Sequence, residues 1–357
     1  MIVVRVVHLT GSPVSDFLED LSRRYALDCI AATADPVRYE FRIAHVAPDG
    51  RWRFPDDLSR AALDSAQPLP LPEAIARLLQ FEPDVVVPQM FCVPGMTHYR
   101  SLIDALGIPY VGQTPDAMAL AVHKARAKAV VSAAGVRVPD GQVLRAGERP
   151  SLSPPLVVKP VDADNSLGVG VVLRDADLAD ALDEAFAHAD EVLVEDFIPL
   201  GREVRAGCIV RRGELVCLPL EEYSLDPAAP IRTHADKIAR DADGEIHLVA
   251  KHSSRAWIVD PDDPITAPVR DAAIRCHAAL GARHYSLFDF RVDPAGVPWF
   301  LESSPYCSFA PASVIVTMAA AAGIPLETLF AQMLDDARRG SAWRSGFTSQ
   351  PPSTRCW

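Results

Sequence analysis

The 357-residue sequence has no long apolar run, no Cys-x-x-Cys pair and no surplus of basic residues. A membrane-spanning helix needs about 18 or more consecutive apolar residues, so we expect none here. The seven cysteines are odd in number and scattered, which argues against a disulfide framework or a structural zinc site and fits a reducing cytoplasm. The N-terminal segment lacks a basic leader and a small-residue cleavage site, so we expect a first strand there and not a signal peptide.

The charge balance is acidic, because 47 Asp and Glu residues stand against 35 Lys and Arg residues and give a net charge of −12. A chain of this charge is a poor general binder of nucleic acid or of an anionic membrane. Any phosphate that the protein binds must therefore be bound at a local site, by a few lysines or by a metal ion. Hydrophobic residues make up 49% and charged residues 23%, which is typical of a folded protein, and the length suits two or three modules.

Strands and helices alternate along residues 1–113, which predicts an N-terminal open parallel α/β domain. The expected strands cover 2–9, 39–46, 84–88 and 108–111. Helices are expected over 15–25, 73–80 and 99–106, and Gly107 is a typical stop for the last of them.

Two smaller α+β modules are expected to follow, over 114–205 and 206–340. The first has a helix over 116–134 that Thr114 can cap, then strands at 156–160, 169–173 and 191–195. The second has strands at 205–210, 214–218, 286–292 and 299–302, a polar loop over about 222–255, and helices over 267–280, 312–322 and 326–340. Residues 341–357 are expected to form a flexible tail.

One candidate for phosphate binding is the strand that delivers Lys159 into the polar loop 161–168. Such a loop can present backbone N–H groups and a cation to phosphate oxygens. The loop is no P-loop, since no Gly-Lys-Ser/Thr follows the strand. Taken alone, a lysine at a strand end equally suits a solvated surface charge.

Two carboxylates, Asp289 and Glu302, lie near the ends of two strands joined by a turn at 294–296. If these strands pair as a hairpin, both side chains can reach one site. Two hard oxygen ligands together with phosphate oxygens and water suit Mg²⁺. The alternative is a pair of exposed acids on a hairpin.

Three more positions suggest a nucleotide site. Glu195 ends a strand and leads into a linker whose backbone can pair with an adenine edge, and Glu203 follows it as a possible ribose ligand. Lys237 lies in the long polar loop, and loops of that length are often lids. Each of these residues could also be an ordinary surface or strand-end residue.

In this order, and preceded by the helix segment His123-Lys124-Ala125-Arg126-Ala127-Lys128, the features resemble the ATP-grasp superfamily, in particular D-alanine–D-alanine ligases. The resemblance extends to Leu106–Gly112, to the loop Val157–Gly168, and to Asp289-Phe290-Arg291 and Leu301-Glu302-Ser303-Ser304-Pro305. It implies an ATP-grasp fold, with the N-terminal α/β domain followed by two α+β subdomains that clasp ATP, and a carbon–nitrogen ligase that forms ADP.

By position, the resemblance implies roles for individual residues. Lys124 and Lys159 would contact ATP phosphates, and Asn165 and Ser166 would lie over the γ-phosphate. Glu195 and the backbone of Asp196, Phe197 and Ile198 would hold adenine, and Glu203 the ribose. Lys237 would reach the phosphates from the large loop. Asp289, Glu302 and Ser304 would ligate Mg²⁺, with Ser304 where the family usually has Asn.

Some positions depart from the D-alanine ligase pattern. Leu287 stands where the family has an arginine that stabilises the oxyanion of peptide formation, and losing such a donor should cost orders of magnitude in rate. The segment Gly11–Asp16 lacks the glutamate that recognises the first alanine, and Phe91–Thr97 replaces the Gly-Glu-Asp-Gly loop. These departures suggest that ATP handling is retained and that the acceptor differs.

The strings Gly11–Ser15, Pro88–Thr97 and Lys159–Ser166 resemble the D-alanine-ligase-like enzymes of mycosporine-like amino acid biosynthesis. Those enzymes join an amino acid, commonly serine or threonine, to mycosporine-glycine and give products such as shinorine or porphyra-334. Attack there is on a ring carbon of an enol phosphate, so no negative charge builds on a carboxyl oxygen. A leucine at 287 is compatible with that reaction.

Two alternatives remain at this point. One is a D-alanine-type dipeptide ligase with altered specificity. The other is a catalytically silent nucleotide-binding protein, which Ser304 and Leu287 favour. Four residues speak against this second alternative: Lys124, Lys159, Asp289 and Glu302. Arg291 could hold a substrate carboxylate or form a structural ion pair. Candidate substrate contacts are Ser12, Tyr306 and Ser308. By analogy with the family, a cytoplasmic enzyme and a possible homodimer are expected, with small-molecule substrates and neither nucleic acid nor membrane as a partner.

Overall fold

The computed structural model describes residues 3–163, 166–226, 230–231, 238–240, 246–248 and 255–345. The chain divides into two compact units. One runs from the N-terminus to Gly112 and takes up the chain again from Glu327, and the other covers Gln113–Leu326.

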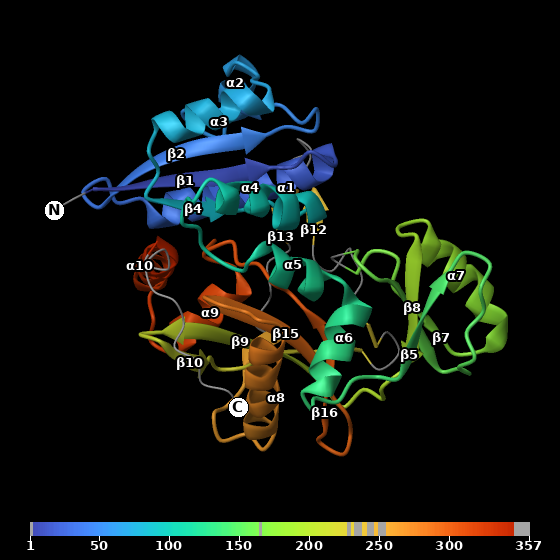
Figure 1. Cartoon of the computed structure of the whole chain (residues 1–357). Coiled ribbons are helices and arrows are strands. Elements are labelled where there is room, and N and C mark those ends of the chain that lie inside the picture. Colours follow the sequence, from blue (N-terminus) through green and yellow to red (C-terminus); the bar gives the residue numbers. More distant parts are fainter. Residues whose placement is uncertain are drawn as a thin grey trace, which may run out of the picture. The chain divides into compact units, whose positions relative to one another are not determined.

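The first unit is built on a four-stranded sheet in the order β3-β2-β1-β4, in which β1 runs parallel to both β2 and β4. Its strands are β1 (Val4–Gly11), β2 (Tyr39–Val46), β3 (Trp52–Arg53) and β4 (Val85–Pro88). Its helices are α1 (Asp16–Thr33), α2 (Arg60–Ser65), α3 (Leu71–Gln80), a π-helical turn η1 (Gly95–Tyr99), α4 (Arg100–Ala105) and α10 (Leu326–Ser345). Of α10, the residues from Glu327 on belong to this unit. Strand β4 is buried on both faces, which explains its continuous apolar run Val85–Val87. Figure 1 shows α2 and α3 along one side of this blue sheet.

The predicted parallel α/β module is therefore present, with β2 at its expected bounds. Helix α1 continues to Thr33, eight residues beyond its expected end at Tyr25. It continues because its apolar stripe goes on through Ala26 and Cys29, which are both buried.

Helix α10 departs from the expectation in two ways. It extends to Ser345, so the predicted tail 341–357 begins as helix, and residues 346–357 lie outside the described part of the chain. It also groups with the first unit and not with the C-terminal module. The reason is packing: the Phe330 ring contacts those of His8, Tyr39 and Phe41.

His8 is wholly buried in this unit, and burial lowers the pKa of its imidazole to about 3. Its Nδ1 lies 3.0 Å from Gln89 Nε2. The unfolded chain binds a proton near pH 6.5 and the folded chain does not, so stability falls as pH drops below 6.5. We expect a loss of about 1.4 kcal/mol per pH unit between pH 6 and 4, measured by urea unfolding. A His8→Gln variant should lack this part of the acid dependence, and an unchanged slope would contradict the assignment.

The second unit begins with a four-stranded antiparallel sheet in the order β5-β8-β6-β7. Its strands are β5 (Gly141–Arg145), β6 (Leu156–Pro160), β7 (Gly170–Val172) and β8 (Glu191–Asp196). The helices of this part are α5 (Pro115–Val122), α6 (Lys124–Ala133), a 3₁₀ turn η2 (Asp175–Asp177) and α7 (Leu178–Phe186).

The single helix predicted over 116–134 is wrong, because the chain breaks at His123, whose ψ of 97° is extended. The His123 ring nitrogen caps α6 by accepting from the backbone N–H of Arg126. Lys124 thus becomes the first residue of a new helix, and its backbone N–H donates to Val161 O at 2.8 Å. The break places Lys124 beside the loop that follows β6.

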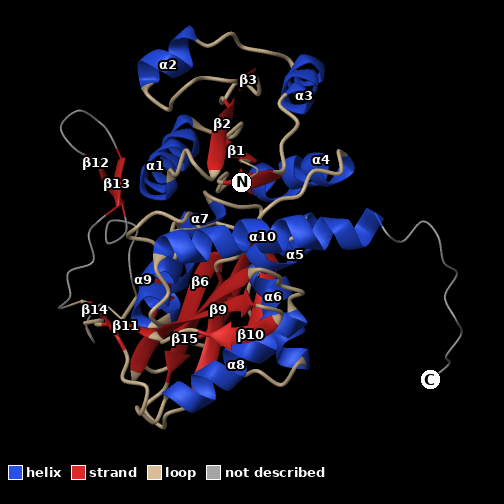
Figure 2. Cartoon of the chain, turned by 90° about the vertical axis from the view of Figure 1, so that its left-hand side faces the viewer, coloured by secondary structure: helices blue, strands red, loops and turns tan. Residues whose placement is uncertain are grey.

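The remainder of the unit is a sheet in the order β14-β11-β9-β15-β16, with β10 paired to β9. Its strands are β9 (Arg202–Arg211), β10 (Glu214–Cys217), β11 (Glu221–Tyr223), β14 (Ala256–Ile258), β15 (Tyr285–Val292) and β16 (Pro298–Ser303), and β12 (Ile238–Arg240) pairs separately with β13 (Ile246–Leu248). The helices are α8 (Thr266–Ala279) and α9 (Val314–Ala321). Figure 2 shows α8 lying along β9, β10 and β15.

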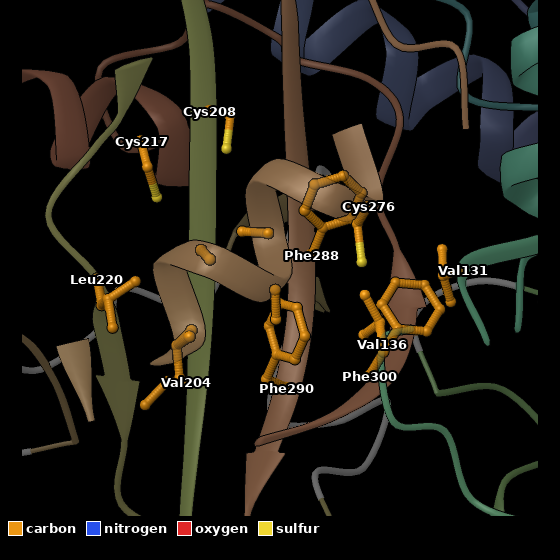
Figure 3. Close-up of a cluster of buried hydrophobic side chains, with 14 of the residues drawn as sticks. Val131, Val136, Val204, Cys208, Cys217, Leu220, Cys276, Phe288, Phe290 and Phe300 are labelled. Carbon is orange, nitrogen blue, oxygen red and sulfur yellow. The ribbon is translucent and has the colours of Figure 1, made fainter. Parts of the chain in front are cut away.

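Alternation along β9 and β15 divides this sheet into an apolar and a charged face. Val204, Ala206 and Cys208 on β9 are buried in one cluster with Phe288 and Phe290 of β15. Figure 3 shows α8 crossing this face above those side chains. The intervening residues of both strands, which include Arg205 and Asp289, must point to the opposite face.

Among the described helices, none is by itself long and apolar enough to cross a membrane. Helices α9 and α10 meet that test only together, as a bent pair. Their apolar residues, including Ile315, Met318, Phe330 and Met333, are buried in the protein's own cores.

Candidate active site

A row of ionisable side chains crosses four strands on the charged face. Glu221 of β11 pairs in register with Arg205 of β9, Arg205 with Asp289 of β15, and Asp289 with Glu302 of β16. Residues that are paired across antiparallel strands share one face of the sheet. The expected hairpin of the last two strands is thus confirmed, and a bulge follows Asp289.

This row borders a pocket with about 800 Å³ of open space, counting the part that opens to solvent. The opposite side of the pocket comes from the β5–β8 sheet and from the first residue of α6. Its charged and polar lining residues are Lys124, Lys159, Ser166, Glu195, Asp196, Glu203, Arg205, Asp289, Arg291 and Glu302. The fold therefore gathers in one pocket most of the residues that the sequence singled out for ATP and metal binding.

Glu195 is almost fully buried and lies between two lysines. Its carboxylate is 2.6 Å from Lys159 Nζ and 3.0 Å from Lys128 Nζ. Burial alone would raise the pKa of Glu195, but the two lysines outweigh burial and hold it below its usual value. Burial lowers the pKa of Lys128 to about 8 against the opposing attraction of Glu195. Glu195, for which the family resemblance implies a role at adenine, thus forms ion pairs with two lysines, and one of them, Lys159, lines the pocket.

Lys124 reaches the pocket from the first turn of α6. Its Nζ donates to the carbonyl of Ala163 and lies 3.8 Å from Glu302. The same lysine therefore bridges the loop after β6 and the carboxylate row on the other side of the pocket. With Lys159 it forms a cationic wall suited to phosphate oxygens.

The loop after β6 contributes Ser166, which adopts φ +59° within a turn and lines the pocket. Gly168 closes the loop with φ +67°, and a methyl group there would lie 2.8 Å from the His188 ring. Asn165 lies outside the described residues, as does Lys237 of the long polar loop.

The predicted ribose ligand Glu203 is paired with Arg291, whose Nη2 lies 2.6 Å from the carboxylate. Arg291 is buried and also donates to the carbonyl of Ile198 at 3.3 Å. Its guanidinium lies 5.4 Å from the centre of the Phe197 ring. Of the two alternatives for Arg291, the structure shows the ion pair, and this pair ties Glu203 to the linker that contains Asp196, Phe197 and Ile198.

Asp289 and Glu302 are the candidate metal ligands. In the part of the chain that the structure describes, no group of three or more His, Cys, Asp or Glu side chains is arranged so that it could hold a metal ion by itself. A metal bound to these two carboxylates would have to complete its shell with phosphate oxygens and water, and Mg²⁺ binds in that way. Two carboxylates in register on neighbouring strands, facing two lysines across the pocket, fit this ion.

Besides Phe197, four predicted residues do not line this pocket. Ser304 follows β16 and donates its backbone N–H to Leu287 O at 2.8 Å. Ser308 is buried, and its hydroxyl accepts from Ala310 N at 3.3 Å; Tyr306 is half-buried nearby in sequence. Ser12 lies in the first unit, just after β1, where its hydroxyl accepts from Val14 N at 3.1 Å.

The sequence interpretation passed over Arg205 and the pairing of Lys128. Arg205 Nε donates to Asp289 Oδ1 at 2.6 Å, and the guanidinium carbon lies 5.0 Å from the centre of the Tyr223 ring. A signal was present, since Glu203 and Arg205 are two apart on a strand that is otherwise apolar between its terminal residues Arg202 and Arg211. The sequence could not show that Asp289 of β15 pairs with Arg205 of β9.

Comparison with known proteins gives the following relatives. The family model described as the D-ala D-ala ligase C-terminus matches residues 138–335. A D-alanine–D-alanine ligase of Citrifermentans bemidjiense is 34% identical over 242 residues, which covers 67% of this chain and 73% of the relative. One from Gloeobacter violaceus is 31% identical and covers 74% of this chain and 86% of the relative.

Solved structures agree in fold. The D-alanine–D-alanine ligase of Coxiella burnetii has a TM-score of 0.74 at 19% identity and covers 96% of each chain. The Bacillus anthracis enzyme complexed with ATP has a TM-score of 0.70 at 20% identity, covering 96% of this chain and 99% of the other.

Proposed function

We propose that this chain, which belongs to the D-alanine–D-alanine ligase family of ATP-grasp enzymes, joins serine or threonine to mycosporine-glycine. The family makes it an ATP-dependent carbon–nitrogen ligase that forms ADP and acts on small molecules. The identity of the acceptor is the proposed part, and the products would be disubstituted mycosporine-like amino acids such as shinorine or porphyra-334.

The observation that carries this proposal is Leu287. It lies on the charged face of β15, two residues before Asp289, yet it is apolar and only 5% exposed. It pairs with Gly207, where a methyl group would lie 2.7 Å from the Met318 sulfur and 2.9 Å from Ile315 Cδ1 of α9. The position paired with Leu287 therefore lies against an apolar helix, and the Leu287 side chain offers no hydrogen-bond donor to a reacting oxygen.

A reaction without a carboxyl oxyanion tolerates such a position. The carbonyl oxygen of the acceptor would attack the γ-phosphorus, the bond from that phosphorus to the bridging oxygen would break, and ADP would leave. The amine of the amino acid would then attack the ring carbon, expel phosphate and lose a proton to give the imine. Peptide synthesis instead builds charge on a carboxyl oxygen, where a missing donor costs about 100- to 1000-fold in rate.

In this proposal the residues of the pocket bind different parts of ATP and the metal ion. Lys124 and Lys159 hold the phosphates, Ser166 lies over them, and the linker through Ile198 holds adenine beside Glu203. Asp289 and Glu302 would hold Mg²⁺, which supplies charge neutralisation at the phosphoryl group when bound; Ser304 stays a candidate third ligand. Lys237 and Asn165, which lie outside the described residues, would complete the phosphate contacts. Ser12, Tyr306 and Ser308 stay candidate substrate contacts, although they do not line the pocket.

A D-alanine-type dipeptide ligase is the second candidate, because the relatives that share 31–34% identity carry that name. We place either enzyme in the cytoplasm, where ATP is available, and propose a homodimer by analogy with the family.

The test is phosphate release by the purified protein with ATP and Mg²⁺, with mass detection of products. One series receives mycosporine-glycine and single L-amino acids, and the other receives D-alanine alone. Phosphate together with a new imine mass in the first series is expected, and the best amino acid names the product. Dialanine in the second series, without product in the first, would replace the proposal by the dipeptide ligase.

A further inference from the structure

Arg205 is a further cation of the pocket, beside Lys124, Lys159 and Arg291. Its side chain is 13% exposed, lines the pocket and comes from the centre of the β11-β9-β15-β16 row. The row contains three carboxylates, those of Glu221, Asp289 and Glu302, and Arg205 lies between the first two. An arginine in this position remains charged at any pH at which the protein is folded.

The orientation of Arg205 is held from two sides. Its Nε donates to Asp289 Oδ1 at 2.6 Å. On the other side its guanidinium carbon lies 5.0 Å from the centre of the Tyr223 ring, and the Tyr223 hydroxyl donates in turn to Glu221. A guanidinium packed in this way keeps its plane and direction, so little side-chain entropy is lost when it meets a further anion.

Two of the other cations that line the pocket are engaged with groups of the protein framework, while Lys124 lies 3.8 Å from Glu302. Lys159 is paired with Glu195, which is buried, and Arg291 with Glu203 and with the carbonyl of Ile198. The partner of Arg205 differs from those of Lys159 and Arg291, because Asp289, at 2.6 Å, is one of the two carboxylates suited to Mg²⁺. A metal ion on Asp289 would compete with Arg205 for that carboxylate and leave the guanidinium facing the phosphoryl oxygens that share the metal.

We propose that Arg205 is a catalytic residue that binds the terminal phosphoryl group of ATP from the Asp289 side of the pocket. Its planar fork can meet two oxygens of that group at once. Charge on those oxygens is largest during transfer, so the contact would assist the step as well as binding. This inference rests on the proposed metal role of Asp289 and Glu302, and it does not depend on which acceptor the enzyme uses.

The test compares the binding of ATP and ADP in the presence of Mg²⁺ by isothermal titration calorimetry, without any acceptor. The Arg205→Met variant should bind ATP about 10-fold or more weakly, as expected for losing hydrogen bonds to a charged group. Its affinity for ADP, which lacks the terminal phosphoryl group, should stay within about 3-fold. Equal losses for both nucleotides, or no loss for ATP, would overturn the proposal.

Two further variants separate this role from charge balance in the sheet. Arg205→Met combined with Glu221→Gln removes one charge of each sign, and it should show the same selective loss of ATP affinity. Recovery of ATP affinity in this double variant would mean that Arg205 only neutralises its neighbours. Arg202 serves as a matched control, since it lies on the same strand and is paired with Glu222 and Asp263 away from the pocket lining; Arg202→Gln should leave both affinities unchanged.

Discussion

A Glu302→Gln variant is expected to lose about 1000-fold or more in turnover, which corresponds to about 4 kcal/mol of transition-state stabilisation. Glu302 is one of two carboxylates that face the pocket in register, and the amide is a neutral and weaker ligand for a hard cation. Lys124 would also lose a carboxylate at 3.8 Å. The measurement is initial-rate ADP release as a function of Mg²⁺ concentration.

The dependence on Mg²⁺ distinguishes a ligand from a merely structural residue. If Glu302 holds the ion, half-saturation should move to higher Mg²⁺ as well as turnover falling. The fold should survive, because the Glu302 side chain is 30% exposed. Glu214, exposed at the hairpin between β9 and β10, provides the control, and Glu214→Gln should leave rate and Mg²⁺ dependence unchanged. A Glu302→Gln enzyme within about 3-fold of the parent rate would exclude the metal role.

Replacing Glu195 with glutamine is expected to lower the free energy of unfolding by about 3–5 kcal/mol at pH 7. The substitution keeps the size of the side chain but leaves Lys128 and Lys159 buried without their shared anion. Lys159 would also lose the contact that holds it at the pocket, so ATP affinity should fall too. Urea unfolding followed by circular dichroism gives the stability difference.

The pH dependence of that deficit has a definite sign. Lys128 has a folded pKa of about 8, below its ordinary value of 10.5, and without Glu195 it must fall further. The unfolded variant then binds more protons than the folded one over a wider range, so its stability rises with pH from below 7. The deficit relative to the parent should therefore shrink as pH rises toward 8, and it should also shrink below about pH 4.5, where Glu195 of the parent becomes protonated and loses its ion pairs. It should be largest between these two ranges.

Two comparisons make this prediction specific. Glu191 lies on the same strand and pairs with Arg145 at 3.0 Å, but its side chain is 29% exposed. Glu191→Gln should cost less than about 1 kcal/mol, as surface pairs do. Adding Lys128→Met to Glu195→Gln should recover much of the lost stability. A Glu195→Gln variant no less stable than Glu191→Gln would show that the buried cluster contributes nothing.

Local chemistry was readable from the sequence alone. The strand at 39–46 and the hairpin that carries Asp289 and Glu302 follow from short-range pattern, because a strand needs only alternation or an apolar run and a hairpin only a turn between two strands. The position of Lys159 at the end of its strand follows in the same way. The family resemblance, which depends on the order of such features, was confirmed by the relatives.

The partners of these residues were decided by tertiary structure. Alternation says that Glu203 and Arg205 share a face, but it cannot say that β15 lies beside β9 or that Asp289 is the residue opposite Arg205. The break at His123 likewise depends on Lys124 N–H meeting Val161 O, a contact across 37 residues that no helix propensity contains. Helix α10 joins the first unit because Phe330 packs on His8 and Phe41, far away in sequence. Side-chain type and spacing thus determined which chemical groups the protein carries. Long-range strand register and packing determined which charged groups pair with one another. The physical reason is that Coulomb and hydrogen-bond energies depend on distances that the order of residues along the chain does not specify.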